Sequence, residues 1–254
     1  MKREKIYFVS DSHLGVPDYE HSLVREKRLV KWLDVASKDA AGIFILGDLF
    51  DFWFEYRHVI PKGYSRLLGK LAEITDQGIT VHYFTGNHDM WEFGYFEKEL
   101  GMKVHRHPIE MVLQGKRCLI GHGDGLGPGD HGYKWLKRVF SSRIAQKLFS
   151  FLHPGFGIGL ASYMSGKSRL AHEIDDKSFL GEDREMLVVY SKDVLKTREV
   201  DLFIFGHRHY PIMIEIGDGV WFANSGDWIR HFSYLVLEGG QLDLRAFKAG
   251  QELL

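Results

Sequence analysis

Short hydrophobic runs alternate with longer amphipathic segments through the first half of the chain. The short runs have the length and composition of buried strands, and the longer segments repeat apolar side chains at helical spacing. The predicted strands of this half are 6–10, 42–47, 79–85 and 102–105, and the predicted helices are 19–38, 61–77 and 91–100. In the first helix we expect an inward face made of Leu23, Leu29, Trp32, Leu33 and Ala36. This alternation indicates an α/β core.

The second half is richer in strands. A hairpin is predicted over 110–113 and 117–120, because Gln114, Gly115 and Lys116 supply a turn between two apolar runs. Residues 130–170 predict two or three short helices, and 183–197 predicts another amphipathic helix. The predicted strands of the tail are 202–205, 212–216, 220–223, 233–237 and 242–247. We expect this tail to form a second sheet packed on the first, with the helices outside.

Composition narrows the class of protein. The 254 residues are 44% hydrophobic and 26% charged, which suits one soluble domain spanning residues 1–254. The net charge of −1 gives no support to a nucleic-acid partner. The lone Cys118 cannot form an internal disulfide, which fits a cytoplasmic location. No uncharged stretch reaches the ~20 residues that span a bilayer, so we expect any membrane contact to be peripheral.

Five predicted strands end in chemically active side chains. They lead into Asp11-Ser12-His13, Asp48-Leu49-Phe50-Asp51, Gly86-Asn87-His88-Asp89, Gly121-His122-Gly123-Asp124 and Gly206-His207-Arg208-His209. Catalytic groups of open α/β sheets collect at the carboxyl ends of strands. A single Asp or His there is usually a turn former, but five coordinated instances favour a metal site. Imidazole and carboxylate suit Mn²⁺, Fe or Zn²⁺, and two such ions roughly 3.5–4 Å apart can clamp a phosphoryl group.

The ordered set of motifs resembles the signature of the calcineurin-like metallophosphoesterases. The resemblance implies a four-layer αββα sandwich with two divalent metal ions at the edge of the sheets. It implies one metal held by Asp11, His13, Asp48 and His209, and another by Asp48, Asn87, His122 and His207, with Asp48 bridging. It also implies two catalytic residues, with His88 facing the substrate phosphate and Asp51 orienting it. A helix or turn cap is the alternative for Asp51.

The predicted short helices of the second half are unusual in charge. Between His131 and His172 there is no Asp or Glu, while lysines, arginines and apolar side chains recur at helical spacing. A basic amphipathic segment with aromatics is typical of a membrane-surface or acyl-chain-binding element. We expect Phe140, Phe149 and Phe156 to contribute to its apolar face. The alternative is an ordinary helical insert that packs on the sandwich with its lysines in water.

The run from Gly47 to Trp53, followed by a helical insert directly after His122-Gly123-Asp124, resembles the UDP-2,3-diacylglucosamine diphosphatases of lipid A biosynthesis. The resemblance implies that residues 130–170 form a cap that holds acyl chains over the site. The implied substrate contacts are Asn87, His88, Asp130, Tyr133 and Lys167. The implied reaction is attack of water on the α-phosphate of the acylated nucleotide-sugar, which releases UMP, with manganese as the expected metal and iron or zinc as alternatives.

Other functions remain open at this point. The best-known lipid enzymes have Arg where this chain has His88, so another phosphodiester or nucleotide-sugar pyrophosphate is an alternative substrate. A non-enzymatic scaffold on this fold usually lacks some ligands, whereas every ligand position is filled here. We therefore expect a cytoplasmic hydrolase that contacts the cytoplasmic face of the inner membrane peripherally. The sequence does not determine its oligomeric state.

Overall fold

The hydrophobic runs of the first half form the parallel part of a six-stranded sheet in the computed structural model, which describes residues 2–129, 131–161 and 178–248. The parallel strands are β1 (Lys5–Val9), β2 (Ala40–Ile45), β3 (Thr80–Phe84) and β4 (Lys103–His105). Strand β10 (Ser233–Glu238) pairs antiparallel with β1, and β11 (Gln241–Ala246) completes the edge.

A five-stranded sheet is built from the middle of the chain. Its order is β5 (Ile109–Leu113), β6 (Lys116–Ile120), β7 (Leu202–Phe205), β9 (Val220–Asn224) and β8 (Ile212–Gly217). The expectation that the whole tail joins this sheet is wrong for its last two strands. Strand β10 instead pairs with β1, a position that buries both of its apolar faces: Tyr234 and Val236 pack toward the helices, and Leu235 and Leu237 pack between the sheets.

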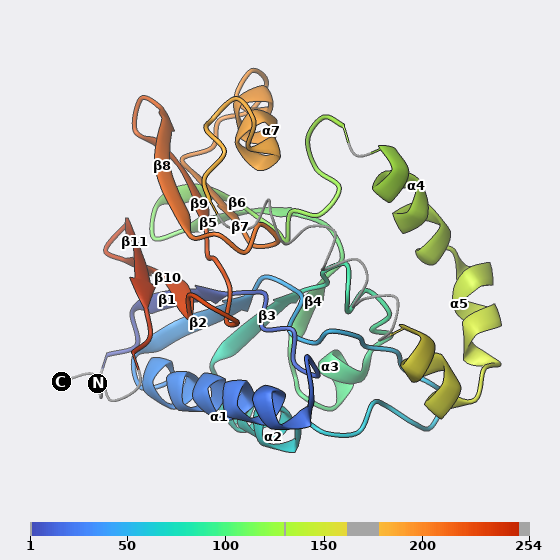
Figure 1. Cartoon of the computed structure of the whole chain (residues 1–254). Coiled ribbons are helices and arrows are strands. Elements are labelled where there is room, and N and C mark those ends of the chain that lie inside the picture. The colour runs from blue at the N-terminus through green and yellow to red at the C-terminus, as the bar shows by residue number, and fades with distance from the viewer. Residues whose placement is uncertain (1, 130, 162–177, 249–254) are drawn as a thin grey trace.

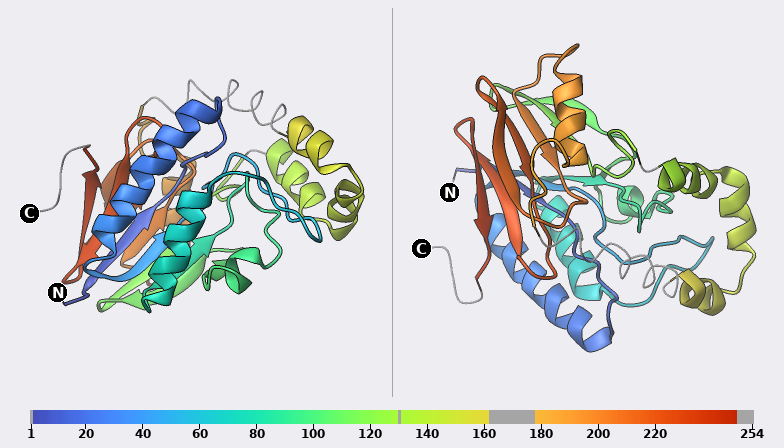
Figure 2. Two further views of the ribbon diagram at one scale, coloured as in Figure 1. Left: turned by 90° about the horizontal axis from the view of Figure 1, so that it is seen from below. Right: turned by 45° about the horizontal axis from the view of Figure 1, so that its top comes forward.

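The two sheets and their covering helices form four layers, which confirms the predicted αββα sandwich (Figure 1). Helices α1 (Tyr19–Ala36) and α2 (Ser65–Asp76) cover the outer face of the first sheet, as Figure 2 also shows. Helix α7 (Met186–Val194) covers the second sheet. Helix α3 (Tyr95–Lys98) is a single turn, shorter than the predicted 91–100. No helix among the described residues is long and apolar enough to cross a bilayer.

In the first half of α1, the buried face contains polar side chains where an apolar face was expected. Leu23 is only half-buried, whereas Arg25 and Glu26 are buried. Glu26 Oε1 accepts the backbone N–H groups of Arg66 and Leu67 at 3.0 and 3.2 Å. These donors belong to the first turn of α2, which has no side-chain cap of its own, so Glu26 satisfies groups that would otherwise be orphaned.

Helices α4 (His131–Phe140) and α5 (Arg143–Ser150) and a further helical segment, 154–161, lie to one side of the sandwich (Figure 1). Aromatic contacts attach this insert. The Phe149 ring lies 4.7 Å from the rings of both Phe54 and Trp91, and Trp91 Nε1 donates to the carbonyl of Phe140 at 2.8 Å. Phe140 and Phe149, two of the three phenylalanines expected on the insert's apolar face, therefore join the insert to the main sandwich.

The buried imidazole of His82 makes stability depend on pH. Burial, together with His105 and Lys103, lowers the pKa of His82 from 6.5 to about 4. The unfolded chain therefore binds a proton between pH 6.5 and 4 that the folded chain does not, so stability falls as pH falls through this window. We expect His82→Phe, which can keep the stack on Phe44 (ring centroids 4.3 Å apart), to remove about 2 kcal/mol of the stability loss at pH 5.

The measurement is urea unfolding of metal-free protein at pH 7.5 and pH 5, for the wild-type chain and for the variant. Comparing the two proteins cancels the titration of the carboxylates they share. An equal loss of stability in both would show that His82 is not the group responsible.

Candidate metal centre

The loops that follow paired strands are themselves joined by backbone hydrogen bonds. Beyond β1 and β2, the N–H of Asp11 donates to Gly47 O at 3.1 Å, and the N–H of His13 donates to Asp48 O at 3.0 Å. In the second sheet, Gly206 N donates to His122 O at 2.9 Å. These bonds fix the polar side chains at one edge of each sheet, and the two edges face each other.

Five side chains of this edge sit on strained backbone. They are Asp11, His13, Asp48, His207 and His209, whose φ angles lie between 40° and 68°. A non-glycine residue seldom adopts this left-handed conformation, and such strain persists where the surrounding structure enforces it, commonly at functional sites. All five belong to the predicted ligand set. The strain therefore falls on five of the seven predicted ligands, and also on Tyr64, Gln114 and Phe232 outside the site.

The loops also approach one another too closely for larger residues. Gly47 has a φ of +99°, and a Cβ added there would lie 2.7 Å from Nδ1 of His122 and 2.8 Å from the backbone N of Gly86. Both approaches are shorter than real Cβ contacts. Glycine at position 47 therefore allows His122, from the second sheet, to reach the loops of the first.

One group of ligands is formed by Asp11, His13 and His209. The Nε2 atoms of the two histidines are 3.1 Å apart, and Asp11 Oδ1 lies 3.3 Å from His209 Nε2 and 3.8 Å from His13 Nε2. Asp11 is fully buried, and its Oδ1 has no hydrogen-bond partner, while Oδ2 accepts the N–H of His207 at 2.9 Å. A buried carboxylate oxygen aimed at two imidazoles fits a cation between the three side chains.

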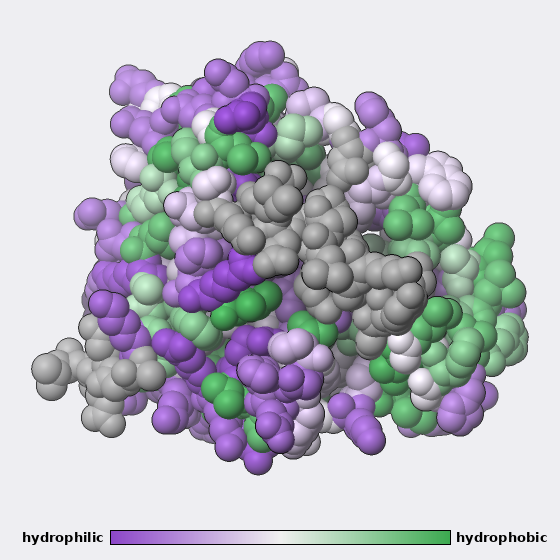
Figure 3. All heavy atoms as spheres, in the orientation of Figure 1, coloured by the Kyte–Doolittle hydropathy of each residue, from purple (hydrophilic) through white to green (hydrophobic). Residues whose placement is uncertain are grey.

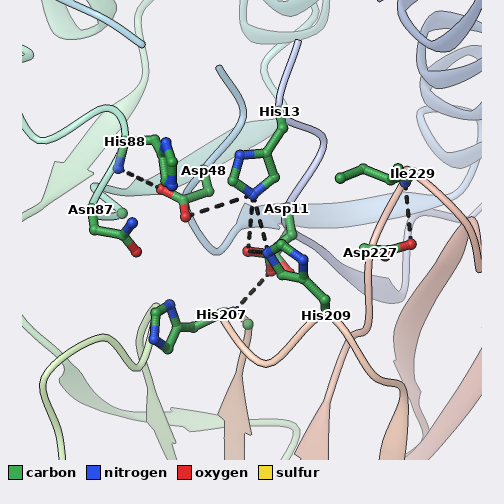
Figure 4. A network of polar contacts seen from close by, with 12 residues as sticks. Asp11, His13, Asp48, Asn87, His88, His207, His209, Asp227 and Ile229 are labelled. Carbon is green, nitrogen blue, oxygen red and sulfur yellow. Dashed lines mark hydrogen bonds and ion pairs between the residues drawn. The ribbon is translucent and has the colours of Figure 1, made fainter. Parts of the chain in front are cut away.

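A second group contains Asp48, His122 and His207. His122 Nδ1–H donates to the carbonyl of Leu46 at 2.7 Å, which leaves Nε2 free as a ligand atom. That Nε2 lies 3.2 Å from Asp48 Oδ2 and 3.3 Å from Asn87 Oδ1. Asp48 Oδ2 also lies 3.8 Å from His13 Nε2, so the same oxygen faces both groups (Figure 4). The donor set fits divalent metal ions.

The pKa shifts show how strongly the site attracts positive charge. Burial raises the pKa of Asp48, but His122 and His88 outweigh burial and leave the pKa below its usual range. Burial lowers the pKa of His122, but Asp48 outweighs burial and raises it to about 10. Burial lowers the pKa of His207 to about 4, so this imidazole is neutral at pH 7, as a metal ligand must be.

His88 and Asp51 adjoin the first group. His88 Nδ1 donates to the main-chain carbonyl of Asp51 at 2.9 Å. The Asp51 carboxylate lies between two imidazoles, with Oδ1 3.6 Å from His13 Nδ1 and 3.8 Å from His88 Nδ1. Burial lowers the pKa of His88 to about 4. The main chain of Asp51 thus orients His88, while its side chain sits close enough to His13 and His88 to form a further potential ligand group.

Two aspartates have supporting roles that the sequence did not assign. Asp89 accepts the N–H groups of Gly86 at 2.7 Å and Leu49 at 2.8 Å, which joins the loops that carry Asn87 and Asp48. Its place at the end of the third motif was the only signal of this role.

Asp124, two residues after His122, is the other. It accepts Lys137 Nζ at 2.6 Å and the hydroxyl of Tyr133, which joins α4 to the His122 loop. The predicted substrate contact Tyr133 therefore lies beside the site. The predicted contacts Asp130 and Lys167 lie outside the described residues.

Comparison with known proteins identifies a family of phosphoesterases, which fits the Asp and His groups described above. The chain belongs to the calcineurin-like phosphoesterase family, whose model matches residues 4–211. Within that class, a UDP-2,3-diacylglucosamine hydrolase from Porphyromonas gingivalis is 38% identical over 258 residues, covering 97% of this chain and 98% of the relative. A protein of the same name from Aeromonas salmonicida is 27% identical, covering 92% of this chain and 90% of the relative.

Substitutions of Asp48 and His88 are expected to have different effects on metal content and on turnover. Replacing Asp48 by Asn removes the oxygen charge that faces both ligand groups, so we expect Asp48→Asn to lose most of its bound metal. We expect His88→Ala to retain metal and to lower turnover by roughly 10²–10⁴-fold, the range for a general acid. Elemental analysis and turnover of a simple phosphodiester give the two readouts. Loss of metal in His88→Ala would identify His88 as a ligand instead.

Proposed function

We propose that this chain hydrolyses the pyrophosphate of UDP-2,3-diacylglucosamine, giving UMP and 2,3-diacylglucosamine 1-phosphate. The observation that carries the proposal is the end-to-end 38% identity with the Porphyromonas gingivalis UDP-2,3-diacylglucosamine hydrolase. The Asp and His centre beside a basic, aromatic insert supports it, because that pairing suits a substrate with both phosphates and acyl chains.

The proposed cofactors are two divalent metal ions, with manganese preferred. Asp11, His13 and His209 would hold one and Asn87, His122 and His207 the other, with Asp48 shared between them. Bound there, the metals would supply charge neutralisation for the phosphate oxygens and a more acidic water. His88 Nδ1–H is used by the carbonyl of Asp51, so His88 would donate a hydrogen bond or proton toward the phosphate or the leaving oxygen from Nε2, in its protonated form.

We propose that the insert over residues 130–170 is a cap that binds the acyl chains of the substrate. Phe149 anchors the insert by packing on Phe52, Phe54 and Trp91, of which Phe54 and Trp91 are buried. Exposed apolar side chains of the insert, such as Phe156, are available to acyl chains, and each methylene moved from water onto them is worth about 0.8 kcal/mol before ordering costs. A cap built this way would favour acylated substrates over their soluble counterparts.

The same insert offers a surface for the membrane that holds a diacylated substrate. Ile144 and Leu148 on α5 and Phe151 at its C-cap recur at helical spacing and are 74%, 64% and 76% exposed. Arg143 and Lys147 accompany them. Figure 3 shows hydrophobic side chains gathered over the side of the molecule that carries the insert. We propose that this stripe rests on the acyl boundary of an anionic membrane, on the cytoplasmic face, with the basic residues at the headgroups.

A direct assay tests the substrate. With Mn²⁺ present, we expect kcat/KM for UDP-2,3-diacylglucosamine to exceed that for the unacylated UDP-sugar at least about 10²-fold, since two chains bury many methylenes. UMP should appear as product, and a chelator should abolish it. Equal kcat/KM values for the acylated and the unacylated UDP-sugar would show that the cap does not bind acyl chains. Hydrolysis of bis-p-nitrophenyl phosphate alone would indicate another phosphodiester as the substrate.

Co-sedimentation with vesicles tests the membrane surface. Leu148→Glu places a charge in the exposed stripe, and we expect it to lower the bound fraction on anionic vesicles about tenfold, because burial of a leucine is worth about 1.5–3 kcal/mol. Val24→Glu is a matched control, since Val24 is also on a helix and is 67% exposed. Added salt should weaken wild-type binding. Equal effects of the two substitutions would place the membrane contact elsewhere.

A further inference from the structure

A cavity of about 340 Å³ lies between α4 and the segment that follows β4, and His122 forms part of its wall. This volume is within the range of small-molecule sites, about 300–1,000 Å³. Arg106 and His107 line it from the β4–β5 connection, and Lys134, Lys137 and Arg138 line it from α4. The cavity therefore begins at a metal-ligand residue and is bordered by cations on two sides.

Helix α4 has its polar face turned inward. Lys134, Lys137, Arg138 and Ser141 follow the i, i+3, i+4, i+7 spacing of one helix face and line the cavity. Trp135, Leu136 and Val139 on other faces are 64%, 38% and 37% exposed. A helix that merely packs on a protein buries its apolar face and leaves its lysines in water. Lys134 and Lys137 are half-buried and Arg138 is exposed, so the basic face borders a cavity that an anion can enter from solvent.

The positive charges of this wall are only partly compensated by the protein. Arg106 pairs with the buried Glu92 at 3.0 Å, and Lys137 pairs with Asp124 at 2.6 Å. Lys134 donates to a main-chain carbonyl, that of Gly127. Arg138 has no hydrogen bond or ion pair with any residue in the part of the chain that the structure describes. Two cations, Lys134 and Arg138, thus face the cavity without a carboxylate partner.

We propose that this cavity binds the nucleotide half of the substrate, a uridine 5′-phosphate group, with Lys134 and Arg138 as its anion-binding residues. The assignment rests on the proposed function, which requires a place for UMP next to the metal centre. The polar, basic lining suits a nucleotide and not an acyl chain. Since His122 borders the cavity, a phosphate at the centre can extend its nucleoside beneath α4, while the acylated sugar extends toward the aromatic surface of the insert.

Titration calorimetry of UMP with the Mn²⁺-loaded full-length protein tests the proposal. We expect Arg138→Ala and Lys134→Ala each to weaken UMP binding about tenfold, as expected for loss of a charge-assisted contact. Arg138→Lys should recover part of the loss. Arg66→Ala, an exposed arginine on α2, is the control and should leave binding unchanged. Circular dichroism melts of each variant separate a binding defect from unfolding.

Two further ligands identify what the cavity recognises. Inorganic phosphate should bind more weakly than UMP and lose less affinity in Arg138→Ala, and diacylglucosamine 1-phosphate should lose none. Unchanged UMP affinity in both alanine variants would overturn the proposal. So would an equal loss for phosphate, or a loss for the lipid product in place of UMP. UMP binding is measured without turnover, so failure to hydrolyse the acylated substrate would count against the proposed function and not against the cavity.

Discussion

Two carboxylates buried at strand ends, Asp11 and Asp48, constrain the rest of this structure. Both are almost fully excluded from water and lie among imidazoles, so the folded chain concentrates negative charge where the protein can least tolerate it alone. The N–H groups of His207 and His88, which donate to Asp11 and Asp48, offset part of the cost, and positive charge between the carboxylates offsets more. Without metal, a proton on His122 supplies part of that charge, which is why its pKa rises to about 10, and a divalent metal bound at His122 would replace that proton. The left-handed backbone of five ligands persists because the sandwich holds it around this charge.

The sequence predicted where these Asp, Asn and His side chains meet, because each of them directly follows an apolar run along the chain. An apolar run predicts a strand, and the polar residues after it must lie at that strand's end. Parallel pairing of β1, β2 and β3, and of β6 and β7, then brings Asp11, Asp48, Asn87, His122 and His207 together. The contact between the two sheets needed no further signal, because both carry a fully apolar face.

What the sequence did not reveal depends on partners distant along the chain. Strand β10 is apolar on both faces, and nothing in its residues says which sheet it joins. Arg25 and Glu26 look like solvent-facing positions of α1, yet Arg25 donates to the carbonyl of His13 and Glu26 caps α2. Polar side chains at such positions are buried because a particular backbone group needs a partner. That need exists only once the fold has formed.

The insert combines two opposite amphipathic helices, and this explains why charge pattern alone left its role undecided. Helix α4 turns its cations toward a cavity beside His122, whereas α5 turns an apolar stripe outward. Both helices contain basic and aromatic residues, so composition alone does not distinguish their orientations. Their difference in orientation follows from attachment at two ends: Asp124 holds Tyr133 and Lys137 near the His122 loop, and the aromatic surface around Trp91 holds Phe140 and Phe149. Asp124 lies two residues from His122, so its contacts with Tyr133 and Lys137 link α4 to the loop of this proposed metal ligand. The insert and the metal centre therefore share one electrostatic network, in which an anion under α4 would neutralise cations that the protein itself leaves uncompensated.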